Sequence, residues 1–282
     1  MRERAAQELT PDRRHGAQRP DAGRPTRPAQ GHALPPAGPL ERLNRFLARS
    51  GVASRRAADE LIANGEVFVN GRRPPPTGLL VDPDNDLVTI NGRAIRPVTK
   101  HRYVLLNKPL GVMTTARDEE GRRTVLDAIG PEGVGTHRLY PVGRLDADTT
   151  GLLMLTDDGQ LAYRLTHPRY KVGKEYSAVV SGIPNEKDLV ALRNGIQLED
   201  GVTAPAEVEV VRTAPGPQAE VRLVIHEGRK RQVRRMMEAT GHPVLALKRV
   251  GLGPVKLGRM KEGGWRLLVE GELAALRRAT GL

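Results

Sequence analysis

The sequence predicts an α+β protein in which a small domain and a larger domain follow a basic N-terminal tail. Three observations support this fold class. The chain has 282 residues, a length that favours two domains. Its composition changes sharply near residue 41. Beyond residue 102, short strand signals outnumber helical ones, which indicates an antiparallel-rich mixed sheet. We place the tail at 1–40, the small domain at 41–96, a linker at 97–102 and the larger domain at 103–282.

The charge balance restricts the class of partner. Lys and Arg total 45 against 33 Asp and Glu, which gives a net charge of +12 and indicates a polyanion. Nucleic acid is favoured over a membrane because no apolar run reaches the roughly 18 residues of a spanning helix and no secretory signal is present. The chain has no Cys, which excludes disulfides and thiol catalysis and fits the cytoplasm. Its seven His are scattered, so we expect no metal site.

The first 40 residues are polar and rich in Pro and Arg. They contain seven prolines and seven arginines against four acidic residues. Such a segment cannot bury enough apolar surface to offset the entropy lost on ordering. We expect a disordered, solvated tail, with weak contact to RNA phosphates as the alternative.

Two short helices open the small domain. Leu43 and Leu47 share one face of the first helix, and Gly51 stands where its C-terminal cap is expected. Ser54 can cap the second helix, which ends at 64–65. Strands are expected at 66–69, 79–81 and 87–90, with Asn-Gly turns at 70–71 and 91–92. The guanidiniums of the helices are candidate phosphate contacts, with a solvated face as the alternative: Arg42, Arg45, Arg49, Arg55 and Arg56.

The larger domain is expected to contain many strands and few helices. Alternating or apolar runs bounded by turn residues predict strands at 103–106, 140–142, 152–155, 176–180, 207–211, 220–225 and 266–269. Helical periodicity predicts helices at 160–166, 186–194, 231–240 and 272–280.

A Gly-rich loop that carries a candidate carboxylate precedes one of these strands. The segment 143–159 reads GRLDADTTGLLMLTDDG, and its apolar run lies between Gly151 and an Asp-Gly turn. Because a buried strand can hold the preceding loop rigidly, Asp146 is the leading candidate for a reactive group, with Arg144 close by in the sequence. Burial alone would raise the pKa of this carboxyl, so a neighbouring cation is needed.

The best source of that cation is the segment 229–235, in which five of seven residues are basic. If a helix starts near Lys230, Val233 and Met236 face inward and Arg234 borders that apolar stripe. Arg229 and Arg231 are candidate RNA contacts, with a solvated basic face as the alternative.

Further candidates lie in three short segments. Lys174 and Tyr176 open a predicted strand, and Tyr176 offers a flat surface for a flipped base or is an ordinary strand residue. Asn107 and Lys108 begin a Pro-Gly turn after the strand at 103–106. Leu247 lies in an apolar run and fits a core position.

These segments resemble two known families. The sequence from Arg42 to Gly71 is similar to the S4 RNA-binding domain, and we extend that resemblance over 41–96. Segment 143–159, together with 107–111, 174–176 and 226–237, resembles the ribosomal RNA pseudouridine synthases of the RsuA and RluB type, over 41 to about 260.

The resemblance implies a role for each candidate. It implies that Asp146 is catalytic, that Arg234 forms an ion pair with it, and that Tyr176 stacks on the base and can accept the proton at C5. It places Leu247 against the catalytic Asp and Lys174 in the Tyr176 motif. Lys174 and Leu247 are counted among the residues that bind the substrate RNA. The remaining candidates are also expected to contact RNA: Asn107, Lys108, Arg144, Arg229 and Arg231.

Two metal-dependent alternatives fit the central motif less well. The Asp-x-Asp-x-Thr spacing from Asp146 also occurs in magnesium-dependent phosphohydrolases, but there it follows an unbroken apolar strand, and we find no convincing set of partner carboxylates. A calcium loop from Asp146 would have Asp157 at its twelfth position and lacks a preceding helix.

The resemblance therefore implies a cytoplasmic, monomeric enzyme that converts a uridine of ribosomal RNA, with 23S RNA favoured, to pseudouridine without a cofactor. The alternatives are a 16S RNA substrate or a non-catalytic RNA-binding factor in ribosome assembly. Whether Asp146 attacks as a nucleophile or removes a sugar proton stays open.

Overall fold

The computed structural model describes residues 40–214 and 216–282. The predicted tail therefore lies outside the described residues, apart from residue 40. No helix in the described part is long and apolar enough to span a membrane.

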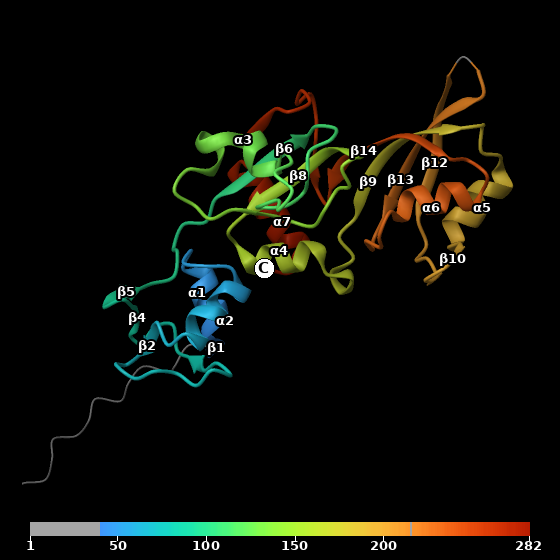
Figure 1. Ribbon diagram of the computed structural model, residues 1–282. Helices are drawn as coiled ribbons and strands as arrows, with labels where there is room; N and C mark the ends of the chain where they lie inside the picture. The colour runs from blue at the N-terminus through green and yellow to red at the C-terminus, as the bar shows by residue number, and fades with distance from the viewer. Residues whose placement is uncertain (1–39, 215) are drawn as a thin grey trace, which may run out of the picture. The chain divides into compact units, whose positions relative to one another are not determined.

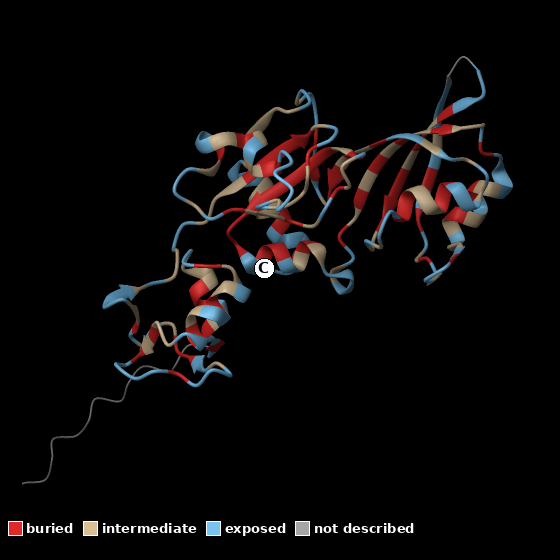
Figure 2. Cartoon of the chain, in the orientation of Figure 1, coloured by how far each residue is buried: buried red, intermediate tan, exposed pale blue. Residues whose placement is uncertain are grey.

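The first segment forms the expected two helices and a small sheet. Its helices are α1 (Leu43–Arg49) and α2 (Arg55–Ala63), and the Ser54 hydroxyl caps α2 by accepting a 3.1 Å hydrogen bond from the Ala57 amide. The strands β2 (Val67–Val69), β4 (Val88–Ile90) and β5 (Arg93–Ile95) form one antiparallel sheet, and β1 (Glu41–Arg42) pairs with β3 (Leu80–Val81). Leu43, Phe46 and Val67 belong to the core of this segment (Figure 2). Strands β1 and β5 were not predicted.

A nine-stranded sheet dominates the rest of the chain (Figure 1). Its main path runs β12-β13-β9-β14-β8-β6-β16, with β7 beside β8 and β15 beside β14. The bounds are β6 (Tyr103–Lys108), β7 (Tyr140–Pro141), β8 (Thr150–Thr156), β9 (Lys174–Ser181), β12 (Glu207–Ala214), β13 (Gln218–Ile225), β14 (Val244–Leu252), β15 (Val255–Lys256) and β16 (Trp265–Leu267). All described pairs in the sheet are antiparallel except β14 with β8. The predicted α+β class with an antiparallel-rich mixed sheet is confirmed.

Helices cover the sheet: α3 (Val125–Val134), α4 (Gly159–Thr166), α5 (Glu186–Asn194), α6 (Gln232–Ala239) and α7 (Glu270–Thr280). Alternate residues of β8 divide between two cores. Leu153 and Leu155 join the core that includes β9, β13 and α6, whereas Leu152 and Met154 pack with α4 and α7. A strand buried on both faces reads as an unbroken apolar run, which is why β8 was recognisable in the sequence.

Two of the longer elements, α3 and β14, were not predicted from the sequence. Helix α3 has a kink at Gly130 (φ 62°) followed by Pro131, so its local pattern indicates a turn more than a helix. Strand β14 combines a continuous apolar run with charged residues and lacks a clear alternation.

The parallel contact between β14 and β8 joins the two parts of the sheet. Lys248 pairs with Thr150, and Arg249 pairs with Gly151. Gly151 has φ +106°, and a Cβ there would lie 2.2 Å from the Arg249 carbonyl oxygen. Glycine is therefore required at this position, because any side chain would separate the strands that support the loop before β8.

Candidate active site

The loop Gly143–Thr149 places Asp146 immediately before β8. The Thr149 amide donates to the Asp146 carbonyl over 3.0 Å and closes a turn, while the Gly111 amide donates to the Ala147 carbonyl over 2.8 Å. The Thr114 hydroxyl bonds the Leu145 carbonyl at 2.5 Å, and the Leu145 side chain is buried in the core. The backbone on both sides of Asp146 is thus fixed, while its side chain stays 37% exposed.

Asp146 lies on the wall of a cleft. The opposite wall is the segment that follows β6, and the lining residues include Met113, Thr115, Arg117, Asp118, Glu119, Arg122, Arg144 and Ala147. Arg122 is occupied by ion pairs with Asp118 and Glu120 at 2.8 and 2.9 Å. Arg144 is exposed in this cleft beside Asp146, where the sequence placed an RNA contact.

The arginine nearest to Asp146 differs from the expected one. The Arg231 guanidinium lies 3.9 Å from the Asp146 carboxylate and 3.0 Å from that of Asp148. Arg234 donates instead to the carbonyl oxygens of Asp148 at 2.7 Å and Val244 at 3.1 Å, and it lies 3.3 Å from the Asp148 carboxylate. The expected Arg234–Asp146 ion pair is thus not the arrangement in this structure, because two backbone carbonyls hold Arg234 between the loop and β14.

Asp148 is the carboxylate that these arginines hold most closely. Partial burial raises its pKa, but the hydrogen bonds from Arg231 and the charge of Arg234 outweigh this effect, so the pKa of Asp148 lies below its ordinary value. No catalytic or binding role was predicted for Asp148 from the sequence. Its two guanidinium partners connect the loop before β8 to the start of α6.

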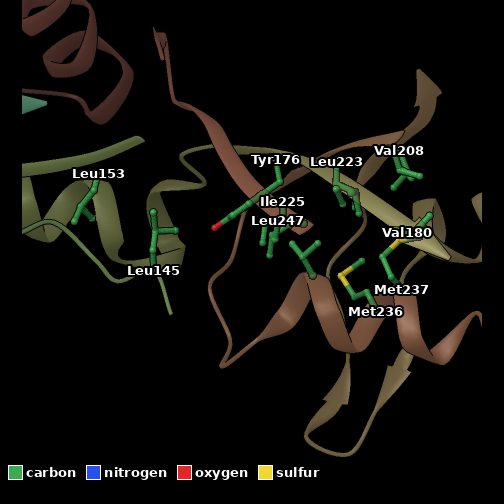
Figure 3. Close-up of a cluster of buried hydrophobic side chains, with 14 of the residues drawn as sticks. Leu145, Leu153, Tyr176, Val180, Val208, Leu223, Ile225, Met236, Met237 and Leu247 are labelled. Carbon is green, nitrogen blue, oxygen red and sulfur yellow. The ribbon is translucent and has the colours of Figure 1, made fainter. Parts of the chain in front are cut away.

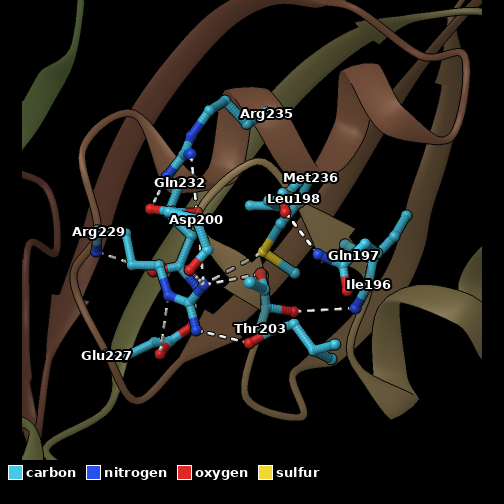
Figure 4. Close-up of polar contacts among 12 residues, drawn as sticks. Ile196, Gln197, Leu198, Asp200, Thr203, Glu227, Arg229, Gln232, Arg235 and Met236 are labelled. Atoms are coloured by element: carbon cyan, nitrogen blue, oxygen red, sulfur yellow. Dashed lines mark hydrogen bonds and ion pairs between the residues drawn. The ribbon is translucent and has the colours of Figure 1, made fainter.

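Arg229 is used within the protein. Its guanidinium donates to the carbonyl oxygens of Gly201 at 2.9 Å and Val202 at 2.6 Å, in the hairpin of β10 (Gln197–Leu198) and β11 (Gly201–Val202). Arg235 forms a bidentate pair with Asp200 in the same hairpin, at 2.9 and 3.0 Å (Figure 4). In this structure the Arg229 side chain fixes the hairpin against the start of α6, and its predicted contact with RNA stays a prediction.

Asn107 and Lys108 are buried rather than directed toward RNA. Both have 0% exposure. The side-chain amide of Asn107 donates to the Met260 carbonyl at 2.8 Å. The Lys108 ammonium donates to the carbonyls of Pro109 and Thr149, each at 3.0 Å. Burial lowers the pKa of Lys108 to about 8, although the charges of Asp146 and Asp148 act in the opposite direction. Lys108 therefore supplies an internal cation behind the Asp146 loop.

Tyr176 and Leu247 lie in the core next to this loop. They are 8% exposed each, and the Tyr176 ring extends toward Leu145, the residue before Asp146 (Figure 3). Tyr176 is paired in register with Arg249 of β14. Lys174, two residues earlier on β9, is 9% exposed, and burial together with the charge of Arg249 lowers its pKa to about 8. Lys174 is thus largely buried in this structure, and its predicted contact with RNA stays a prediction.

The arginines of the first segment keep two kinds of environment. Arg49 and Arg45 lie 2.5 and 3.6 Å from the buried carboxylate of Glu41. Arg42, Arg55 and Arg56 are exposed. Arg55 and Arg56 lie in the first turn of α2, and that turn has no acidic residue. Exposed cations at a helix N-terminus oppose the helix dipole, which an RNA phosphate would relieve.

Comparisons with known proteins agree with this arrangement. Residues 102–239 match the family model described as RNA pseudouridylate synthase, and residues 41–73 match the S4 domain. The chain is 46% identical over 244 residues to an uncharacterized RNA pseudouridine synthase of Aquifex aeolicus, which covers 86% of this chain and 95% of that protein. The chain belongs to the RNA pseudouridine synthase family. The expected protein family and enzyme class are thus confirmed.

Two further comparisons extend over most of this synthase. It is 44% identical over 244 residues to the ribosomal large subunit pseudouridine synthase B of Bacillus subtilis, covering 84% of this chain and 96% of that one. The crystal structure of a pseudouridylate synthase superposes with a TM-score of 0.60 at 31% identity, covering 83% of this chain and 99% of that one. In the described part of the synthase, no cluster of His, Asp and Glu is arranged to hold a metal ion.

Proposed function

We propose that this synthase converts a specific uridine of ribosomal RNA, in the large subunit, to pseudouridine, with Asp146 as the catalytic carboxylate. The relative from Bacillus subtilis, named for the ribosomal large subunit and aligned over 84% of this chain, carries the substrate proposal. The fixed loop around a half-exposed Asp146, at the wall of a cleft, carries the catalytic proposal. The proposal includes a monomeric, cytoplasmic enzyme that needs no cofactor.

The reaction is an isomerisation that exchanges two bonds. The bond from C1′ to N1 breaks, the base turns, and a bond from C1′ to C5 forms, while the C5 proton is lost and N1 gains a proton. One ionised carboxylate can begin this sequence, either as a nucleophile at C1′ or as a base toward a sugar proton. The Asp146 side chain is accessible for either role because only its backbone is held by the loop.

Two cations support the ionised form of Asp146. Lys108 lies behind the loop and bonds the Thr149 carbonyl at 3.0 Å, and Arg231 lies 3.9 Å from the carboxylate on the exposed side. When RNA covers the cleft and excludes water, the loss of solvent would disfavour the charged form of the carboxylate, and both positive charges would favour it. We therefore propose that Lys108 and Arg231 keep the carboxylate charged. The family resemblance had implied this role for Arg234.

Tyr176 is proposed as the stacking partner of the flipped base. Its ring lies in the core beside Leu247, with its hydroxyl end directed toward the Asp146 loop (Figure 3). An extruded base needs an apolar face on which to stack. This position allows the same residue to accept the C5 proton after the base has turned.

The test is site-resolved pseudouridine mapping of ribosomal RNA from cells that lack the protein, complemented with wild type or Asp146→Asn. We expect one large-subunit uridine to lose its mark and only the wild type to restore it. Loss of a small-subunit mark would transfer the substrate to 16S RNA. Restoration by Asp146→Asn would end the catalytic assignment, and an unchanged map would favour a binding factor.

A further inference from the structure

Three aromatic rings form a cluster outside the candidate active site, on α4 and on the short helix η1 (Pro168–Tyr170) that follows it. The Tyr163 ring centroid lies 5.0 Å from that of His167 and 6.0 Å from that of Tyr170, and the His167 and Tyr170 centroids are 6.3 Å apart. We call Tyr163, His167 and Tyr170 the aromatic cluster. It contains two of the five Tyr of a chain with only 3% aromatic residues.

Core packing does not account for the cluster. Helix α4 buries Leu161, Ala162 and Leu165, whereas Tyr163 lies on its other side and is 50% exposed. His167 is also exposed, and the turn after α4 is open to solvent (Figure 2). Tyr170 packs partly against the core and anchors the cluster. Exposed rings held in a fixed arrangement by a buried neighbour indicate a binding surface more than a contribution to stability.

The charged residues of the segment that carries the cluster have one sign. The segment 161–173 contains Arg164, Arg169 and Lys171 and no acidic residue. The guanidiniums of Arg164 and Arg169 lie 5.3 and 5.1 Å from the Tyr170 ring centroid. Arg169 and Lys171 are exposed, and Lys171 is held with a positive φ of 50°. Aromatic faces interleaved with cations suit unpaired nucleotides, whose bases stack while their phosphates contact the cations.

The cluster is connected to the candidate active site through a short basic segment. The His226 Nδ1 lies 2.9 Å from the Lys171 carbonyl oxygen. Five residues later, Arg231 bonds the Asp148 carboxylate over 3.0 Å, next to Asp146. The segment 226–231 therefore contacts Lys171, the residue after the cluster, at one end and the loop of Asp146 at the other.

We propose that the aromatic cluster, with Arg169 and Lys171, binds an unpaired nucleotide that flanks the modified uridine in the substrate RNA. Tyr163 and His167 provide the stacking surface, and the two cations contact the adjoining phosphates. The inference rests on the proposed function for the identity of the RNA. It adds a second, sequence-tolerant contact that aligns the strand entering the cleft, so it should lower the Michaelis constant and leave the chemical step unchanged.

The experiment measures RNA affinity of the full chain by fluorescence anisotropy. The probes are a labelled single-stranded dodecamer of uridylate and a 12-base-pair RNA duplex. A Tyr163→Ala/Arg169→Ala double variant should bind the single strand about tenfold more weakly and the duplex less than twofold more weakly, because stacking requires an unpaired base. Tyr163→Phe keeps the ring and should match wild type. Arg212→Ala, which removes an exposed cation on β12, is the charge control and should change neither affinity.

A second measurement locates the contact directly. A dodecamer with 4-thiouridine should photo-cross-link to the peptide that contains Tyr163 and His167. Single-strand affinity of the double variant within twofold of wild type, without this cross-link, would overturn the proposal and leave a protein as the occupant to seek. These measurements need no turnover, so they are independent of pseudouridine mapping. Mapping can support the proposed function even where cluster binding fails.

Discussion

The two ends of β8 carry carboxylates in opposite situations. Asp157, directly after the strand, is buried and lies 3.1 Å from His101 Nδ1 and 2.7 Å from His137 Nδ1, while the Arg102 amide donates to it at 3.0 Å. Asp146, shortly before the strand, is 37% exposed, and its ion-pair partner Arg231 lies 3.9 Å away.

This difference separates a carboxylate in a structural environment from the proposed catalytic one. A buried carboxylate must have its hydrogen-bonding capacity satisfied, and Asp157 has three partners from two further segments of the chain. Asp146 keeps most of its hydrogen-bonding capacity for a ligand. Strand β8 only fixes the position of the loop that carries it. Under the proposed function, the strand has a structural end at Asp157 and a functional end at Asp146, and substitutions at the two ends should have separable effects.

The largest effect is expected at the functional end. Asp146→Asn should reduce kcat at least about 1,000-fold, because the amide can neither attack nor accept a proton. The free energy of unfolding should change by less than about 0.5 kcal/mol, because the side chain is partly exposed. Single-turnover kinetics and urea unfolding measure the two quantities. RNA affinity should stay within about threefold, since the phosphate contacts remain.

The reverse pattern is expected for Asp157→Asn. Loss of its charged hydrogen bonds should lower the free energy of unfolding by about 1–3 kcal/mol, with kcat/KM of the folded enzyme within twofold of wild type. Urea unfolding and steady-state kinetics test this expectation. Glu207→Gln, at an exposed position on β12, is the matched control and should change neither. A large loss of kcat with unchanged stability would show that Asp157 also serves the reaction.

The cation behind the functional end predicts an alkaline limit of activity. Burial lowers the pKa of Lys108 to about 8. The ammonium that supports Asp146 is therefore present below that pH and is lost as the pH rises through it. We expect kcat/KM to fall above pH 8, approaching about tenfold per unit, in a pH-rate profile. Lys108→Met should have lower activity without this step, and a wild-type profile that is flat to pH 9.5 would contradict the role.

The smallest effect is a pH dependence of stability at the structural end. The hydrogen bond with Asp157 raises the pKa of His101. The stability that this bond contributes is therefore complete below pH 6.5, the pKa of His in the unfolded chain, and is lost as the pH rises through the pKa of the folded state. Burial opposes the ionisation of Asp157, but its hydrogen bonds with His101 and His137 outweigh this effect and lower its pKa. The stability that the ionised carboxylate contributes is therefore lost as the pH falls below about 3.8. Thermal unfolding should show the greatest contribution between about pH 4 and 6.5, and Asp157→Asn should flatten the profile.

Local patterns of the chain accounted for much of the fold. The run 152–155 predicted β8 because both of its faces are buried, and Ser54 predicted the start of α2 because capping involves residues only three apart. The kinked α3 was missed because Gly130 and Pro131 imitate a turn. Strand β14 was missed because its neighbours on both sides come from distant segments, which no local alternation records.

Composition and local pattern were enough to predict the α+β class, the cationic balance and the position of Asp146 in a loop before a buried strand, because each depends on residue content or on neighbours along the chain. The cations that surround that loop could be identified only once the chain was folded. Arg231 meets Asp148 across 83 residues, and Lys108 meets Thr149 across 41. Which arginine or lysine pairs with a given acceptor depends on where the strands end and on which backbone carbonyls lack a hydrogen bond from a neighbouring strand. Chain folding over long separations therefore directed Arg229 and Arg234 to backbone carbonyls and left Arg231 beside the candidate catalytic carboxylate.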